Sequence, residues 1–174
     1  MPNITNAKCV LVLGATSGIG RALALAIHDL ESHPTVIVAG RRQERLNELC
    51  SQGKRIKSVQ IDSTSGRESL RQFAAKMVSE YPELDTVIFS AGIQHTFNFN
   101  EPEKIDLDKL EAELGTNYIS IVTLITFLTP HFLKLSVSPI PSLPQDFSNN
   151  PWNTYHYRNR RKGFRPLLFP SHLD

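Results

Sequence analysis

The chain has 174 residues, of which 40% are hydrophobic and 21% charged, as in a soluble protein with one buried core. A formal net charge of only +2 argues against binding to nucleic acid or acidic membranes through the overall field of the molecule. Two cysteines exclude a disulfide framework, and Cys9 opens an apolar run in which we expect a buried, unreactive thiol. The six histidines show no metal-ligand spacing, so no metal site is expected.

Neither apolar stretch of the sequence indicates a membrane segment. The first, Cys9–Leu13, is short and ends at a glycine, unlike a secretory signal peptide. The longest, residues 118–128, falls short of the roughly 20 residues that span a bilayer. We therefore expect a soluble, cytoplasmic protein without a membrane partner.

Short apolar runs alternate with helical stripes through the first 135 residues. Continuous runs of this kind are typical of strands buried on both faces, and they occur at residues 9–13, 35–39 and 86–89. Residues 56–61 are predicted as a further strand, the third in chain order. Apolar residues at helical spacing predict a helix after each strand, beginning near residues 19, 46, 70 and 107. The last helix is expected to run to about Leu135, with a bend at Pro130.

The order of these elements predicts an α/β fold. Strands that alternate with helices form a parallel sheet with right-handed crossovers and helices on both faces. The result is a doubly wound parallel sheet, which here stops after the fourth strand and the long helix. Residues 65–68, Ser-Gly-Arg-Glu, have the pattern of a capping box at the start of the third helix.

The pattern changes after Ser136. Six of the eleven prolines follow it, the apolar periodicity ends, and five Lys or Arg face only two Asp or Glu. We predict two regions, a domain at 1–135 and a proline-rich basic tail at 136–174 that is irregular or disordered. Aromatic and basic residues interleave at 155–162, as in some single-stranded nucleic-acid binders. A solvated charge run explains them more simply, so no nucleic-acid partner is expected.

A glycine-rich segment, Gly14-Ala-Thr-Ser-Gly18-Ile-Gly20, lies between the first strand and the first helix. Glycines at this place allow a tight turn, close approach of a pyrophosphate, and close packing of helix on strand. The bound phosphate then meets the positive end of the helix. A purely structural turn is the alternative, but the strand–loop–helix setting favours nucleotide binding.

The spacing G-x-x-x-G-x-G resembles that of the short-chain dehydrogenase/reductase family, over about residues 8–135. The resemblance implies a Rossmann-type fold and hydride transfer between a nicotinamide dinucleotide and a carbonyl or alcohol carbon. It assigns Gly14, Ser17, Gly18, Ile19 and Gly20 to cofactor binding. Leu13 stands where the family usually has a threonine.

The end of the second strand favours NADP over NAD. An acidic residue there would hydrogen-bond the ribose 2′-hydroxyl of NAD, whereas a cation would pair with the 2′-phosphate of NADP. This sequence has Arg41 and Arg42 after Gly40, and no acid. Both arginines could instead be solvated residues of the next helix, but cations are unfavourable at a helix N-terminus.

Three further positions resemble family sites. Asp62 matches a residue whose carboxylate meets the adenine ring, although a turn former is nearly as good an interpretation of it. Ser90-Ala91-Gly92 matches the family's Asn-Ala-Gly beside the cofactor, with serine in place of asparagine. Asn117 matches the asparagine that supports a proton relay to the catalytic lysine, whereas the alternative is a helical asparagine without a role.

The resemblance ends before the residues that perform the chemistry. The family needs a serine followed by Tyr-x-x-x-Lys, and no such motif occurs in this chain. Tyr157 with Arg161 is a near match, but a guanidinium is a poor substitute for the ammonium. Two functions remain: an NADP-dependent oxidoreductase that is inactive alone because its catalytic half is missing or replaced, and a non-catalytic nucleotide-binding or interaction protein.

The predicted fold also leaves apolar surface uncovered. A fourth strand without a fifth beside it has an open edge of unpaired backbone groups. Residues 118–128 are apolar nearly all round, as in a helix buried at a subunit interface. We therefore expect a homo-oligomer or a covering partner protein.

Overall fold

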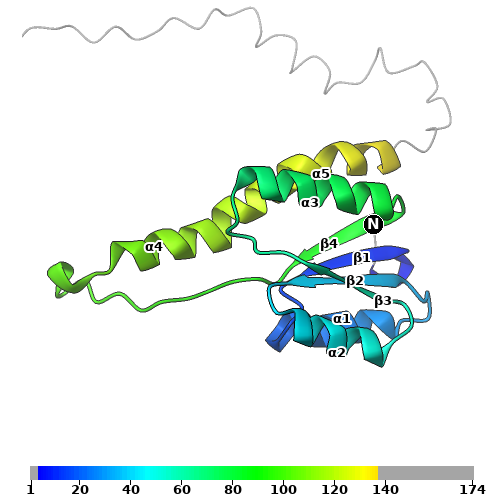
Figure 1. The fold of residues 1–174 in the computed structure, drawn as a ribbon, viewed down its shortest axis with the longest axis horizontal. Helices are drawn as coiled ribbons and strands as arrows, with labels where there is room; N and C mark the ends of the chain where they lie inside the picture. Colours follow the sequence, from blue (N-terminus) through cyan, green and yellow to red (C-terminus); the bar gives the residue numbers. More distant parts are fainter. Residues whose placement is uncertain (1–3, 137–174) are drawn as a thin grey trace, which may run out of the picture. The chain divides into compact units, whose positions relative to one another are not determined.

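The computed structural model describes residues 4–136, which form a four-stranded parallel sheet between two layers of helices (Figure 1). The strands are β1 (Cys9–Leu13), β2 (Thr35–Gly40), β3 (Ile56–Gln60) and β4 (Leu84–Phe89). The α-helices are α1 (Gly18–His28), α2 (Gln43–Gln52), α3 (Arg67–Glu80), α4 (Leu107–Leu114) and α5 (Ser120–Ser136). The shorter helical turns are η1 (Ile4–Asn6), η2 (Pro102–Lys104) and the π-helical η3 (Gly115–Ile119).

The strand order, β3-β2-β1-β4, confirms the predicted doubly wound topology. All three pairings are parallel, and Leu11 at the centre of β1 lies opposite Ile37 of β2 and Val87 of β4. The chain reaches β4 only after passing from the β3 edge back across the sheet. The strand order therefore reverses between β1 and β4, and in such sheets a ligand binds at this point, outside the carboxyl ends of the strands.

Each face of the sheet has its own apolar core, because successive side chains of a strand point to opposite faces. Val10 and Val12 of β1 pack with α1 and α2 on one face. Leu11 and Leu13 pack with α3 and α5 on the other. Figure 1 shows these two helical layers on opposite sides of the sheet. Since both faces are covered, every residue of β1 is buried, as the continuous apolar run predicts.

Cys9 is buried at the start of β1, and the prediction of a buried thiol is confirmed. Burial is the main reason why the pKa of this thiol rises to about 11, and the nearby carboxylates Asp85 and Glu83 raise it further. Because the thiolate is the reactive form, this cysteine is held in its inert state at neutral pH.

The predicted capping box at residues 65–68 is wrong. The cap of α3 is Gly66, at φ +93°, without a side-chain hydrogen bond. The Ser65 hydroxyl donates instead to the Asp62 carbonyl at 2.6 Å, and the Glu68 carboxylate accepts from Arg71 at 2.7 and 2.8 Å. Both members of the expected pair therefore have nearer partners. The fourth strand also begins earlier than predicted, at Leu84 instead of Thr86.

The last helix runs continuously through α4, η3 and α5, and Pro130 lies inside α5 without ending it. Its residues Leu107–Leu135 form the one helix within residues 4–136 that is long and apolar enough to cross a membrane, by length and composition only. A core helix of a soluble domain meets the same criteria. Leu124 and Leu128 are buried, and Leu124 belongs to the core shared with α3, so one face of α5 covers the sheet.

The other face of this helix is exposed. Five of its large apolar side chains are 45 to 61% exposed: Leu114, Tyr118, Ile119, Val122 and Ile125. Among the described strands, β4 pairs with β1 alone and its second edge is open. The apolar surface expected from the sequence is thus present on the described part of the chain.

Candidate nucleotide-binding site

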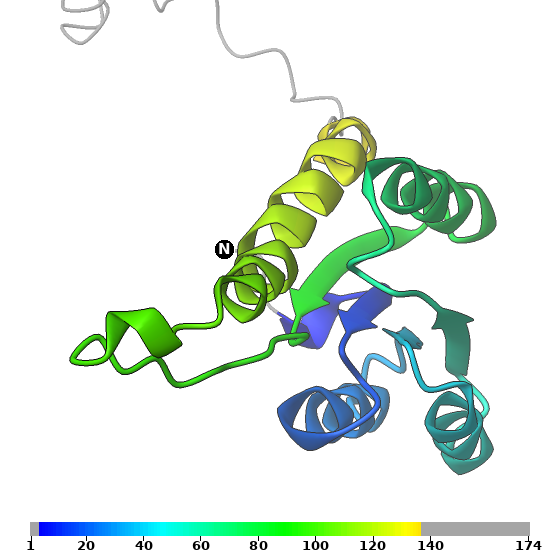
Figure 2. The same ribbon diagram turned by 60° about the vertical axis from the view of Figure 1, so that its left-hand side comes forward.

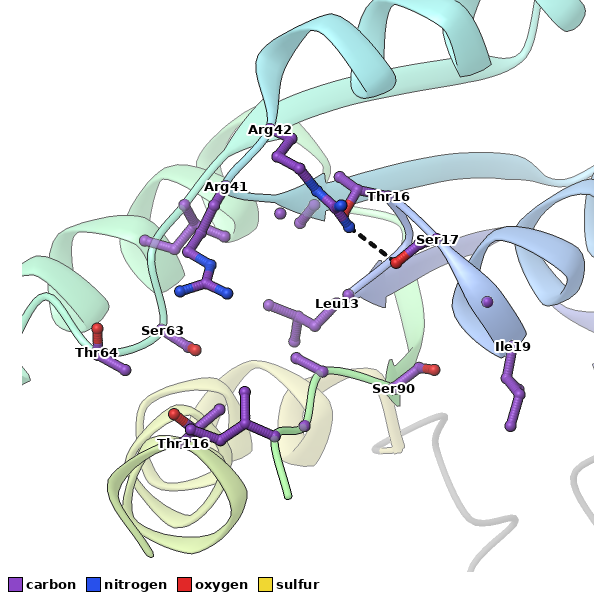
Figure 3. A pocket seen from close by; sticks show the side chains of 18 residues that line it. Leu13, Thr16, Ser17, Ile19, Arg41, Arg42, Ser63, Thr64, Ser90 and Thr116 are labelled. Carbon is purple, nitrogen blue, oxygen red and sulfur yellow. Dashed lines mark hydrogen bonds between the residues drawn. The ribbon is translucent and has the colours of Figure 1, made fainter. Parts of the chain in front are cut away.

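A cavity of about 420 Å³ lies at the carboxyl ends of β1, β2 and β4, next to the point where the strand order reverses. Its walls come from the glycine loop, the two residues after β2, the turn after β3, the segment after β4, and η3 (Figure 3). Nine of the twelve residues predicted as a site line it: Gly14, Ser17, Gly18, Ile19, Arg41, Arg42, Ser90, Ala91 and Gly92. The other three, Gly20, Asp62 and Asn117, do not line it.

Gly14 is required where the glycine loop passes the end of β4. A Cβ on Gly14 would lie 2.4 Å from the backbone nitrogen of Ala91, and its φ of +82° is unfavourable for other residues. Gly20 has a packing role, since a Cβ there would lie 2.4 Å from the Gly14 carbonyl oxygen. These two glycines therefore bring α1 and β4 against one loop.

Gly18 and the start of α1 leave backbone amides open to the cavity. Gly18 has φ +55°, and nothing lies within 4 Å of the position that a Cβ would take. Ser17 is the N-cap of α1 but makes no side-chain capping bond, and the first turn has no acidic residue. The unpaired amides and the positive end of the helix are thus free for an anion, which fits the pyrophosphate of a dinucleotide.

Two arginines follow β2 and behave differently. Arg42 donates from Nη2 to the hydroxyls of Thr16, at 2.9 Å, and Ser17, at 2.8 Å, as Figure 3 shows for Ser17. The guanidinium of Arg41 reaches into the cavity and makes no hydrogen bond to the described residues. No carboxylate side chain lines the cavity within residues 4–136, so its polar groups suit a negatively charged ligand.

Asp62 forms the turn after β3. Its Oδ1 accepts hydrogen bonds from the Thr64 backbone nitrogen, at 2.9 Å, and from the Thr64 hydroxyl, at 2.7 Å. These two bonds, the backbone one first, lower the pKa of the carboxyl below its usual value, with a smaller contribution from Arg41. The turn places Ser63 and Thr64 on the cavity wall. In this structure Asp62 shapes the wall through a turn, which was the alternative reading of this residue.

Asn117 lies in η3 and binds the segment after β4. Its Oδ1 accepts from the Ile93 backbone nitrogen at 2.9 Å, and its Nδ2 donates to the Ile93 carbonyl at 2.7 Å. A Cβ on Gly92 would lie 3.3 Å from this Oδ1, so the glycine allows the amide to approach. Both polar atoms of the Asn117 side chain are therefore engaged at the edge of the cavity.

Comparison with known proteins supports the interpretation of this cavity as a nucleotide-binding site. The profile of a family described as short chain dehydrogenase matches residues 8–140. The chain belongs to the short-chain dehydrogenase/reductase family. This family binds a nicotinamide dinucleotide, in agreement with the open amides of the glycine loop.

The chain matches only part of the length of its relatives in this family. The chain is 34% identical to the uncharacterized oxidoreductase DltE of Bacillus subtilis over 149 residues, which cover 84% of this chain and 56% of the relative. It is 28% identical over 126 residues to the NADP-dependent 3-hydroxy acid dehydrogenase YdfG of Shigella flexneri. The match covers 72% of this chain and 49% of the relative. The chain thus spans about half the length of the curated relatives that it matches.

Solved structures of the family share the fold. Serine dehydrogenase from Escherichia coli superposes with a TM-score of 0.64 at 26% identity, over 73% of this chain and 57% of that chain. A closed form of serine dehydrogenase complexed with NADP+ gives the same TM-score and identity, over 73% and 50%.

Sequence reasoning missed several residues on the cavity wall. Thr16 and Thr116 are both buried and line the cavity, and each directly precedes a residue that was singled out, Ser17 and Asn117. Gly40 entered the prediction only because no acidic residue stands at the end of the second strand. It lines the cavity, and a Cβ there would lie 2.7 Å from Thr16 Cγ2, so a larger residue would crowd Thr16. Their positions beside the short-chain dehydrogenase/reductase motifs were the signal that could have found them.

The close approach at Gly14 can be tested by Gly14→Ala. The added Cβ meets the Ala91 backbone and also takes an unfavourable φ, so we expect the free energy of unfolding to fall by about 2–4 kcal/mol in urea denaturation. Gly66→Ala is the matched control, because Gly66 also has a positive φ but has nothing within 4 Å of the added Cβ. Equal losses in the two variants would contradict a specific requirement at Gly14.

Proposed function

We propose that this chain binds NADP through the cavity at the carboxyl ends of β1, β2 and β4, and that by family it is a hydride-transferring oxidoreductase that is inactive alone. The observation that carries the proposal is the guanidinium of Arg41, which makes no hydrogen bond to the described residues and reaches into a cavity that no described carboxylate lines. The YdfG relative, which is NADP-dependent, and the serine dehydrogenase structure complexed with NADP+ support this choice.

The cofactor assignment follows the polarity of the cavity wall. Arg41 and Arg42 would hold the 2′-phosphate through charge-assisted hydrogen bonds. The amides around Gly18 would bind the pyrophosphate. Ser90-Ala91-Gly92, on the β4 side of the strand reversal, would then border the nicotinamide half. Asp62 would act on the adenosine end by shaping the turn through which Ser63 and Thr64 reach the cavity.

Hydride transfer in this family needs a proton donor or acceptor as well as the cofactor, and this chain does not supply that group in the usual form. The bound cofactor supplies or accepts a hydride at its nicotinamide ring. The residues of the chain would bind and orient it, and Asn117, through its bonds to Ile93, would hold the segment after β4 in place for it. The sequence contains no Tyr-x-x-x-Lys to move the proton. We propose that residues 1–135 are the nucleotide-binding domain, that residues 136–174 form a separate basic tail outside the described residues, and that the chain alone is inactive.

Arg41→Ala tests the cofactor choice. Loss of a charge-assisted contact to the 2′-phosphate is expected to weaken NADPH binding by about 1.5–3 kcal/mol and to leave NADH binding unchanged. Isothermal titration calorimetry measures both affinities, and Lys54→Ala, which removes an equal charge from an exposed position away from the cavity, is the control. Equal affinities for NADPH and NADH in the unmodified chain would overturn the assignment.

A carbonyl-reductase assay tests the proposal that the chain alone is inactive. A positioned proton donor contributes about 10²–10⁴ in rate, so we expect no NADPH oxidation above background across a panel of aldehydes and ketones. The absorbance of NADPH is the readout. Turnover that Tyr157→Phe abolishes would show that the near match at Tyr157 and Arg161 serves as the catalytic pair.

The exposed apolar face of α5 and the open edge of β4 lead us to propose that the chain associates with itself or with a covering protein. Size-exclusion chromatography with light scattering is expected to show species larger than a monomer, and Ile125→Glu to shift them toward the monomer, because a charge opposes burial of this face. Asn47→Glu, at an exposed position of α2, is the control. A monodisperse monomer of the unmodified chain would contradict the proposal.

A further inference from the structure

After β4 the chain runs without regular secondary structure over residues 90–98 and then returns through η2 to α4 (Figure 2). The segment begins at the cavity, where its first four residues, Ser90 to Ile93, form part of the wall. Apart from the hydrogen bond that the Ser90 nitrogen donates to the Leu13 carbonyl, its backbone makes no hydrogen bond to a described strand, and none of its residues belongs to one. Whatever holds this segment therefore also sets the shape of one cavity wall.

Two helical side chains, four residues apart, bind the backbone of this segment. Glu113 Oε2 accepts a hydrogen bond from the His95 backbone nitrogen at 2.8 Å. Asn117 binds both the nitrogen and the carbonyl of Ile93. Four residues of a helix rise about 6 Å, and two residues of an extended chain span about 6.6 Å, so the helix presents its acceptors at nearly the spacing of the backbone amides.

The Glu113 carboxylate has a second contact with the same residue. The His95 ring Nδ1 is 3.4 Å from Glu113 Oε2, and this nitrogen is buried and has no hydrogen-bond partner within the described residues. The side chains of His95 and Glu113 are only 31% and 24% exposed. Glu113 is thus held between the backbone amide and the imidazole of His95, at a half-buried position in which a charged acceptor is strong.

We propose that Glu113 is a positioning residue for the nicotinamide half of the site. With Asn117 it forms a two-point clasp on Ile93 and His95 that keeps the Ser90–Ile93 wall in its binding shape before the ligand arrives. The inference rests on the proposed binding of NADP, and it adds a residue that acts on the ligand only through the wall. When only a fraction of the molecules has the binding shape, the apparent affinity is reduced by that fraction. Loss of the clasp therefore reduces the affinity for any ligand that needs this wall.

The test compares a whole cofactor with its adenosine half, using the full chain. Glu113→Ala is expected to weaken NADPH binding about three- to tenfold, because the wall then samples other shapes. Binding of 2′,5′-ADP, which lacks the nicotinamide half of the cofactor, is expected to change less than about twofold. Glu113→Gln keeps an acceptor oxygen and should retain most of the NADPH affinity. Glu111→Ala removes an exposed carboxylate from the same helix and is the matched control.

Hydrogen exchange of the ligand-free chain provides a readout that needs no nucleotide. The His95 amide is expected to exchange faster in Glu113→Ala than in the unmodified chain, with little change in β1. Unchanged NADPH affinity and exchange in Glu113→Ala, or equal loss of NADPH and 2′,5′-ADP, would overturn the inference. An unmodified chain that binds neither ligand would overturn the proposed nucleotide function, and this inference with it.

Discussion

The contact between the backbones of Gly14 and Ala91 is the constraint on which the site depends. It joins the end of β1 to the end of β4 at the only place where the strand order of the described sheet reverses. The Gly14 nitrogen donates to Ala39 of β2 at 2.9 Å, and the Ser90 nitrogen donates to Leu13 at 2.9 Å. The carboxyl ends of β1, β2 and β4 are therefore hydrogen-bonded to one another around this turn. The glycine loop, the arginines after β2 and the wall after β4 face a common cavity because of these ties.

Much of the fold was predictable, because the burial of the sheet on both faces leaves a strong mark on the sequence. The apolar runs of β1 and β2 and the helical stripe of α3 report the pattern of burial directly, whereas in α1 the apolar Ile19 and Leu23 are exposed. The prediction of a capping box was wrong because hydrogen-bond partners, unlike burial, leave no clear pattern in the local sequence. A hydroxyl such as that of Ser65 has several acceptors within reach, and the choice of the Asp62 carbonyl depends on a turn that local sequence does not specify.

The candidate site was predictable where a backbone conformation demands a particular residue, as at Gly14 and Gly18. It was less predictable where side chains from distant parts of the chain meet. The clasp of Glu113 on His95 joins residues 18 apart through a loop of irregular structure, and neither residue belongs to a recognisable motif. The different surroundings of Arg41 and Arg42 were likewise hidden, because adjacent residues after a strand point in directions that only the fold determines.

The π-helical turn at Gly115–Ile119 joins two helices with different tasks. Such a turn holds one residue more than an α-helical turn, and each residue of an α-helix advances about 100° around the axis. The extra residue thus sets the phase between the two parts: Glu113 and Asn117 face the segment after β4, while Leu124 and Leu128 face the core. If the same sequence were wound as a regular α-helix, without the wide turn, everything beyond it would be rotated by about 100° relative to α4. The leucines and the clasp could not then both keep their partners, so the length of this turn is as strict a requirement as the identity of any side chain in it.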